Sequence, residues 1–175
     1  MPRIPYVDPE AMAPEVKAVL QTRRSPGGRI FQMMANAGKA TAGYLGFGAA
    51  LRQNLAIDIL IYEITVVRVG ILSNCAYVIR QHEAFLRRNG YPEEKILALR
   101  TRIDSAVFSE AERAALKLVD EVVLNVRASD ETFAEAQRHY GPEALMHIVL
   151  TVGQYMMTCR VAETFDVELE PPKEG

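Results

Sequence analysis

The stretch from Ile57 to Leu72 constrains the fold most strongly, because it is apolar on almost every side. Its β-branched and leucine side chains would also suit a pair of buried strands, but its length favours one helix that is buried on most sides. The acid Glu63 lies inside this stretch, and Arg68 follows too late for a helical i+4 ion pair. A carboxyl group among aliphatic neighbours must be hydrogen-bonded, paired with a cation or protonated.

A second helix is expected directly after the first. Ser73 and Asn74 interrupt the apolar run and are good N-cap residues, and an Asn-Gly pair marks the far end of the next segment. The sequence therefore predicts helices over residues 57–72 and 74–89 that pack as an antiparallel hairpin.

The rest of the chain is also predicted to be helical. Cap residues and chain breakers divide it into further helices, with a capping box that begins at Ser109. These expected helices cover residues 9–24 (beginning at Pro9 or Pro14), 30–37, 38–52, 92–100, 110–126, 130–139 and 143–165. Because no alternating pattern with hairpin turns occurs, the expected fold class is all-α, as one compact domain over residues 1–175 with about seven to nine helices. We expect its termini, residues 1–8 and 168–175, to be loose.

Three side chains near the break between the two central helices can carry proton or thiol chemistry: Glu63, Cys75 and His82. Cys75 is expected in the first turn of the second helix, where free backbone N–H groups and the helix dipole favour a thiolate. His82 lies two turns later on nearly the same face, ~10 Å along the axis, so the two cannot share one zinc ion. If the helices fold back on each other, Glu63 reaches the face that carries His82. The ordinary alternatives are a paired buried acid, a structural histidine and a buried thiol that packs as a small hydrophobe.

The spacing of these residues resembles the signature of the carboxymuconolactone decarboxylase and alkylhydroperoxidase D-like superfamily, and the likeness covers roughly residues 30–168. Glu63 matches the Glu of that signature, Cys75 its first Cys and His82 its His. The second Cys of the redox members falls at Val78. In those members it lies one helical turn before the His, which can deprotonate it for attack on peroxide.

The resemblance leaves three functions open. The first is a decarboxylase-like enzyme in which Glu63 and His82 transfer a proton on a small organic acid. The second is a peroxiredoxin-like enzyme that reduces peroxide through Cys75 alone, although no local thiol is present to resolve its sulfenic acid. The third is a helical oligomeric binding or scaffold protein without catalysis.

Three further residues are candidates for substrate binding. Arg68 and Arg80 could bind a substrate carboxylate, or form surface or interface ion pairs. Tyr77 could donate a hydrogen bond, or simply pack.

The bulk properties exclude several classes of protein. Hydrophobic residues make up 49% of the 175 residues and charged residues 24%, which is typical of a globular protein. A net charge of −2 gives no basic surface for nucleic acid or an anionic membrane. Two cysteines form no disulfide framework, and the N-terminus has no signal pattern, so we expect a cytoplasmic protein. We expect no cofactor and no bound metal, and the resemblance implies a homo-oligomer, a trimer or hexamer.

Overall fold

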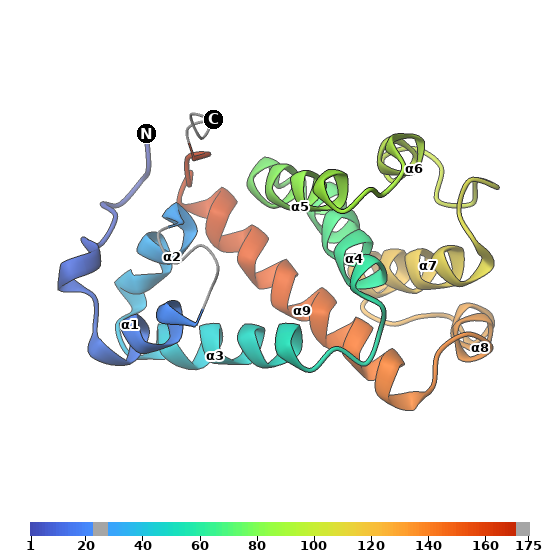
Figure 1. The fold of residues 1–175 in the computed structure, drawn as a ribbon, viewed down its shortest axis with the longest axis horizontal. Helices are drawn as coiled ribbons and strands as arrows, with labels where there is room; N and C mark the ends of the chain where they lie inside the picture. Colours follow the sequence, from blue (N-terminus) through green and yellow to red (C-terminus); the bar gives the residue numbers. More distant parts are fainter. Residues whose placement is uncertain (23–27, 171–175) are drawn as a thin grey trace. The chain divides into compact units, whose positions relative to one another are not determined.

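A computed structural model describes residues 1–22 and 28–170 of the chain, and within these ranges it contains nine α-helices, two short 3-10 helices and no strand (Figure 1). The elements are η1 (Pro9–Ala11), α1 (Pro14–Gln21), α2 (Arg29–Met34), η2 (Ala35–Ala37), α3 (Ala40–Gln53), α4 (Ile59–Leu72), α5 (Ala76–Arg88), α6 (Glu93–Ala98), α7 (Glu110–Asn125), α8 (Asp130–Gln137) and α9 (Pro142–Thr164). The all-α class is confirmed. The last two residues of the first expected helix and the tail 171–175 lie outside the described residues. None of the helices described is both long and apolar enough to cross a membrane.

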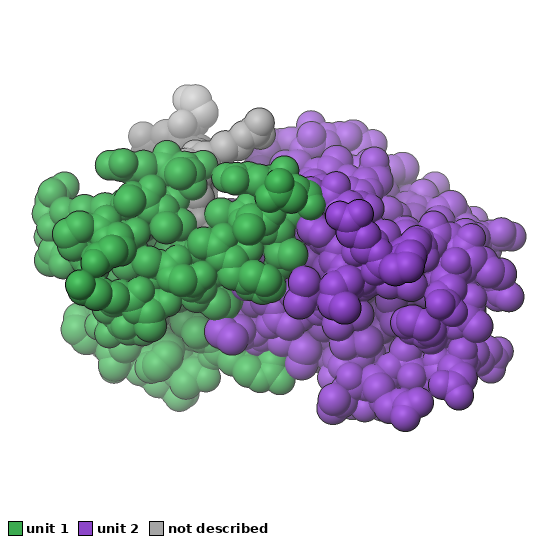
Figure 2. All heavy atoms as spheres, turned by 90° about the horizontal axis from the view of Figure 1, so that it is seen from below, with its two compact units in different colours: residues 1–54, 160–175 green, residues 55–159 purple. Residues whose placement is uncertain are grey.

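The chain groups into two compact units (Figure 2). Unit 1 comprises residues 1–54 and 160–175, and unit 2 comprises residues 55–159. All three residues of the Glu–Cys–His signature lie in unit 2. The expectation of a single domain stays a prediction.

In unit 1, hydrogen bonds connect the N-terminal segment of the chain with the segment that follows α9. The backbone N–H of Arg3 donates to the carbonyl of Phe165 at 3.0 Å. The N–H of Glu168 donates to the hydroxyl of Tyr6, also at 3.0 Å. Where the sequence predicted loose terminal segments, these residues are held by hydrogen bonds between the two ends.

Helix α4 is the central helix of unit 2. Its N-cap is Asp58, which accepts the N–H of Leu60 at 2.7 Å. The helix packs against α5 and α7. Its buried residues cover most of its circumference, as the apolar run predicted: Tyr62, Glu63, Ile64, Thr65, Val66, Val67, Val69 and Gly70.

Helices α4 and α5 form the predicted antiparallel hairpin, and they approach closely at Gly70. A Cβ atom at this position would lie 3.1 Å from side-chain atoms of both Val78 and Ile79. Because the helices are antiparallel, residues that precede Gly70 in α4 lie beside residues that follow Val78 in α5.

The turn between these helices corrects one detail of the sequence analysis. Asn74 adopts a left-handed conformation with φ 55°, and the N–H of Cys75 donates to the carbonyl of Gly70 at 2.9 Å. The N-cap residue of α5 is therefore Cys75, and not Ser73 or Asn74. We had expected Cys75 in the first turn of α5, but it lies one position before that turn.

A buried polar network holds the start of α7. Ser109 and Glu112 form the predicted capping box. The carboxylate of Glu112 also accepts the hydroxyl of Tyr91 at 2.6 Å and the ammonium group of Lys95 at 2.7 Å. Burial opposes ionisation of Glu112, but these donors outweigh it and hold the pKa of Glu112 below its ordinary value.

Candidate functional site

Glu63 and His82 are in direct contact between α4 and α5. The Oε2 atom of Glu63 lies 2.6 Å from the Nδ1 atom of His82, so Glu63 does reach the face that carries His82 and forms a direct hydrogen bond there. The side chain of Glu63 is 1% exposed and that of His82 is 21% exposed. A fully buried carboxylate thus holds an imidazole that remains partly accessible.

The surroundings of this pair strengthen the bond between its members. Glu63 lies in a helix whose neighbouring residues Ile64, Val66 and Val67 are fully buried. An apolar environment lowers the local dielectric constant and makes a charge-assisted hydrogen bond stronger than it would be in water. We therefore regard Glu63 and His82 as a single unit, called the Glu–His pair below.

The bond also determines which nitrogen of the imidazole is free. An ionised carboxylate can only accept hydrogen bonds, so Nδ1 of His82 carries a hydrogen while Glu63 is ionised. The Nε2 atom then serves as a proton acceptor in the neutral imidazole and as a donor in the imidazolium. This arrangement suits general acid–base chemistry at Nε2.

Two tyrosines that the sequence analysis did not single out lie next to the Glu–His pair. The ring of Tyr155, in α9, lies 5.0 Å from the ring of His82 and at 90° to it. The hydroxyl of Tyr155 lies 3.3 Å from the hydroxyl of Tyr62. Tyr62 directly precedes Glu63 in the chain, which could have drawn attention to it, whereas nothing near Tyr155 in the sequence connects it to His82.

Cys75 is fully buried, with an exposed fraction of 0%. Cys159 is 1% exposed, and neither cysteine forms a disulfide. Val78, which takes the place of the second thiol, is buried against Gly70. Burial in apolar surroundings makes a thiol less reactive, so these features do not favour attack by Cys75 on a substrate in solution.

The three candidate substrate-binding residues occupy other faces of their helices. Arg68 makes two bonds of 2.6 Å to the carboxylate of Asp120 and one of 2.6 Å to the carbonyl of Leu99. It follows Glu63 by five residues and so lies about 140° around α4 from it. Tyr77 is buried and lies about 140° around α5 from His82, while Arg80 is exposed and about 160° away. Their use as substrate ligands at the Glu–His pair stays a prediction, and Arg68 already has an internal partner.

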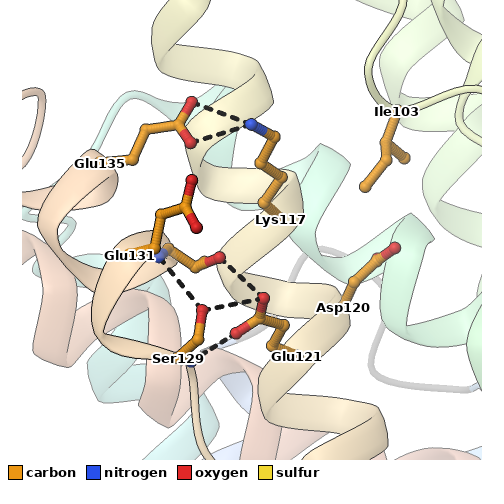
Figure 3. A pocket seen from close by; sticks show the side chains of 8 residues that line it. Ile103, Lys117, Asp120, Glu121, Ser129, Glu131 and Glu135 are labelled. Atoms are coloured by element: carbon orange, nitrogen blue, oxygen red, sulfur yellow. Dashed lines mark hydrogen bonds and ion pairs between the residues drawn. The ribbon is translucent and has the colours of Figure 1, made fainter.

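A polar hollow of about 380 Å³ lies between α7 and α8 in unit 2 (Figure 3). Glu121 accepts bonds from Ser129 and Thr132, and Glu135 accepts the ammonium group of Lys117. These bonds hold the pKa of both carboxyl groups below the ordinary value. The lining does not include the Glu–His pair; it comprises Ile103, Lys117, Asp120, Glu121, Ser129, Glu131, Thr132 and Glu135.

A metal centre has no structural support in the described part of the chain, where no three His, Cys, Asp or Glu side chains gather in a way that could hold an ion. The Oε2 atom of Glu63 and the Nδ1 atom of His82 form a hydrogen bond with each other, so these two atoms are not arranged as metal ligands.

Comparison with known proteins finds a family whose model matches the part of the chain that carries this arrangement. Residues 39–121 match the model of the carboxymuconolactone decarboxylase family. The matched range contains Glu63, Cys75 and His82. The uncharacterized protein YdfG of Bacillus subtilis (strain 168) is 30% identical over 94 residues, which is 53% of this chain and 64% of YdfG. The match therefore spans less than two thirds of that relative.

Solved structures share the fold. An uncharacterized peroxidase-related protein from Ralstonia eutropha JMP134, described as an alkylhydroperoxidase AhpD core, matches with a TM-score of 0.83 at 17% identity over 97% of this chain and 92% of that one. The debrominase Bmp8 matches with a TM-score of 0.75 at 20% identity over 90% and 87% of the two chains. A protein of unknown function from Agrobacterium tumefaciens gives 0.73 at 23% identity over 78% and 95%. At these identities the likeness extends to the fold alone.

Proposed function

We propose that this chain, whose residues 39–121 match the carboxymuconolactone decarboxylase family and whose fold matches that of an AhpD-like protein, is an enzyme in which Glu63 and His82 transfer a proton on a small organic acid. The observation that carries the proposal is the 2.6 Å bond between a buried carboxylate and a partly accessible imidazole. A carboxylate bonded to one imidazole nitrogen fixes the direction in which the other nitrogen can donate or accept a proton.

The proposed step is the protonation that completes a decarboxylation. When the bond to the carboxylate breaks and carbon dioxide leaves, its electron pair stays on the substrate carbon. The Nε2–H of the His82 imidazolium delivers a proton to that carbon, and His82 becomes neutral. Glu63 holds Nδ1–H throughout and stabilises the imidazolium that re-forms when water returns the proton.

The experiment is an assay of carbon dioxide release from a panel of small carboxylic acids that includes muconolactone-type lactone acids. We expect His82→Ala and Glu63→Gln to lower kcat on an active acid by about 10²-fold or more, the usual contribution of a positioned acid or base. Arg88→Ala, at an exposed position in the last turn of α5, serves as the matched control and should keep the wild-type rate. A His82→Ala variant as active as the wild type would remove the proposal.

A second candidate function is peroxide reduction through Cys75, favoured by the shared fold of the peroxidase-related protein from Ralstonia eutropha. The buried Cys75 and the presence of Val78 speak against rapid turnover. We expect slow peroxide consumption with a dithiol reductant in the wild type, and faster consumption in Val78→Cys, where a second thiol can close a disulfide. Rapid turnover by the wild type that is lost in Cys75→Ser would favour this candidate over proton transfer.

The third candidate function is that of a binding protein without catalysis, and one small molecule can be used to test it. A cysteine-to-alanine variant of Bmp8 has been solved in complex with 2,3,4-tribromopyrrole. A brominated pyrrole therefore belongs in the panel. Tight binding measured by calorimetry, with no turnover of any acid or peroxide, would favour this candidate.

The assembly and location of the protein remain proposals. Along α9, apolar side chains recur on one side of the helix and are exposed: Met146 (60%), Val149 (37%), Leu150 (39%) and Met157 (53%). Such a stripe supports a homo-oligomer, a trimer or hexamer, that covers it. Neither cysteine forms a disulfide, which agrees with the reducing cytoplasm that we propose as its location.

A further inference from the structure

His82 is contacted from two helices other than its own. Glu63 of α4 bonds its Nδ1 atom, and the ring of Tyr155 of α9 stands at 90° to its imidazole with the ring centres 5.0 Å apart. The hydroxyl of Tyr155 lies 3.3 Å from that of Tyr62, which belongs to α4 like Glu63. All four residues lie in unit 2, so α4 reaches His82 twice, directly through Glu63 and indirectly through the two tyrosines.

These two contacts restrict different motions of the imidazole. The hydrogen bond of Nδ1 holds one edge of the ring, but small rotations about the side-chain bonds of His82 still tilt the ring plane. Such a rotation moves Nε2, the atom proposed to meet substrate. An aromatic ring packed edge-on against the imidazole blocks this rotation, because edge-to-face pairs have a defined geometry. Proton transfer needs such a fixed direction, since its efficiency depends on the donor being within hydrogen-bond reach of the reacting atom.

We propose that Tyr155, anchored through the hydroxyl of Tyr62, is a positioning residue that holds the plane of the His82 imidazole and so directs Nε2. The inference rests on the proposed role of His82 in proton transfer. Tyr155 acts through His82 and takes no part in the proton transfer itself. The anchor matters because the hydroxyl bond, together with the edge contact of the two tyrosine rings at 6.2 Å, limits how far the Tyr155 ring can turn about its own side-chain bonds.

The test follows the Nδ1–H proton of His82 by NMR on protein labelled with ¹⁵N at histidine. The chain has 3 histidines, so the signal is assigned by its loss in His82→Gln. We expect Tyr155→Leu to raise the exchange rate of this proton with water by about tenfold or more, because the imidazole then opens more often from Glu63. On an active acid, the same variant should lower kcat by a larger factor than it changes KM, because Tyr155 is proposed to act through His82.

Two conservative variants test the anchor. Tyr155→Phe and Tyr62→Phe both remove the hydroxyl contact and keep both rings, so each should raise the exchange rate by a smaller factor. The double variant should raise it by less than the product of the two single effects, because the two changes remove one shared contact. The matched control is Tyr140→Phe, which removes a hydroxyl bond to the carbonyl of Ala111 and should leave His82 unchanged.

An exchange rate in Tyr155→Leu equal to that of the wild type, with an unchanged melting temperature, would overturn the inference. If Tyr155→Leu does not fold, unchanged exchange in both Phe variants overturns it. The exchange measurement needs no substrate, so its outcome is separate from that of the proposed reaction. If proton exchange at His82 is unchanged in Tyr155→Leu while His82→Ala is inactive, Tyr155 has no positioning role but the proposed proton transfer by His82 stands.

Discussion

The carboxylate of Glu63 is buried among aliphatic side chains, and its bond to His82 offsets part of the cost of that burial. The same bond gives the imidazole a fixed inner nitrogen and a free outer one. At the scale of single residues, the bond between Glu63 and His82 therefore both compensates the burial of the acid and orients the imidazole. The acid that is costly to bury is also the group that can stabilise a charged His82.

Val126 is a residue held in an unfavourable conformation. It ends α7 with φ 71°, a left-handed value that β-branched residues rarely adopt, and it is 89% exposed. Because glycine adopts this conformation without strain, we expect Val126→Gly to raise the free energy of unfolding by up to about 1 kcal/mol in urea titrations. Val126→Ala keeps most of the strain and is the control. A glycine variant less stable than the alanine variant would contradict this explanation.

Glu112 should make stability depend on pH. Its pKa lies below the ordinary value of 4.5 in the folded protein, so its contribution is present above about pH 4.5 and is lost as the pH falls through the folded-state pKa. We expect Glu112→Gln to be less stable than the wild type at pH 7, and the difference to shrink at pH 3, in urea titrations at both pH values. Glu110→Gln, an exposed neighbour in the same turn, should show little difference. A difference for Glu112→Gln that stays constant with pH would refute the assignment.

At the scale of elements, the α4–α5 hairpin connects the sequence with the site. Its two helices approach closely at Gly70, where side chains of α5 come within 3.1 Å of the place that a Cβ atom would take. We expect Gly70→Leu to lower the free energy of unfolding by about 1–3 kcal/mol, because the larger side chain must push Val78 and Ile79 aside. Gly43→Leu in α3, where a Cβ meets nothing within 4 Å, is the control and should not destabilise. Equal effects of the two substitutions would show that no close approach exists at Gly70.

The hairpin and the Glu–His contact were predictable because local signals carried both. The length of the apolar run indicated a helix and the Ser73-Asn74 break indicated a turn. A hairpin at this break was the condition under which Glu63 would reach the face of His82. Cys75 was misplaced by one residue because the left-handed conformation of Asn74 depends on how the turn closes. Tyr155 was not predictable, since its contact with His82 joins helices far apart in the chain and no local pattern encodes it.

At the scale of the whole molecule, the exposed apolar stripe on α9 predicts self-association. We expect light scattering at micromolar concentration to report a multiple of the 19.5 kDa chain. Replacing Met146 and Met157 together by Glu should shift the mass toward the monomer, because charges on the stripe oppose its burial. Leu97→Glu, on the exposed face of α6, is the control. A wild-type mass of 19.5 kDa would remove the proposed trimer or hexamer.

The central claim is that Glu63 and His82 act as one unit, and a double-mutant cycle on an active substrate tests it most directly. The measurement is kcat/KM for the wild type, Glu63→Gln, His82→Ala and the variant with both changes. If Glu63 acts only through His82, the double variant loses no more activity than His82→Ala alone, since residues that act as a unit are strongly non-additive. Losses that simply add would show that the two side chains act independently and would contradict the account.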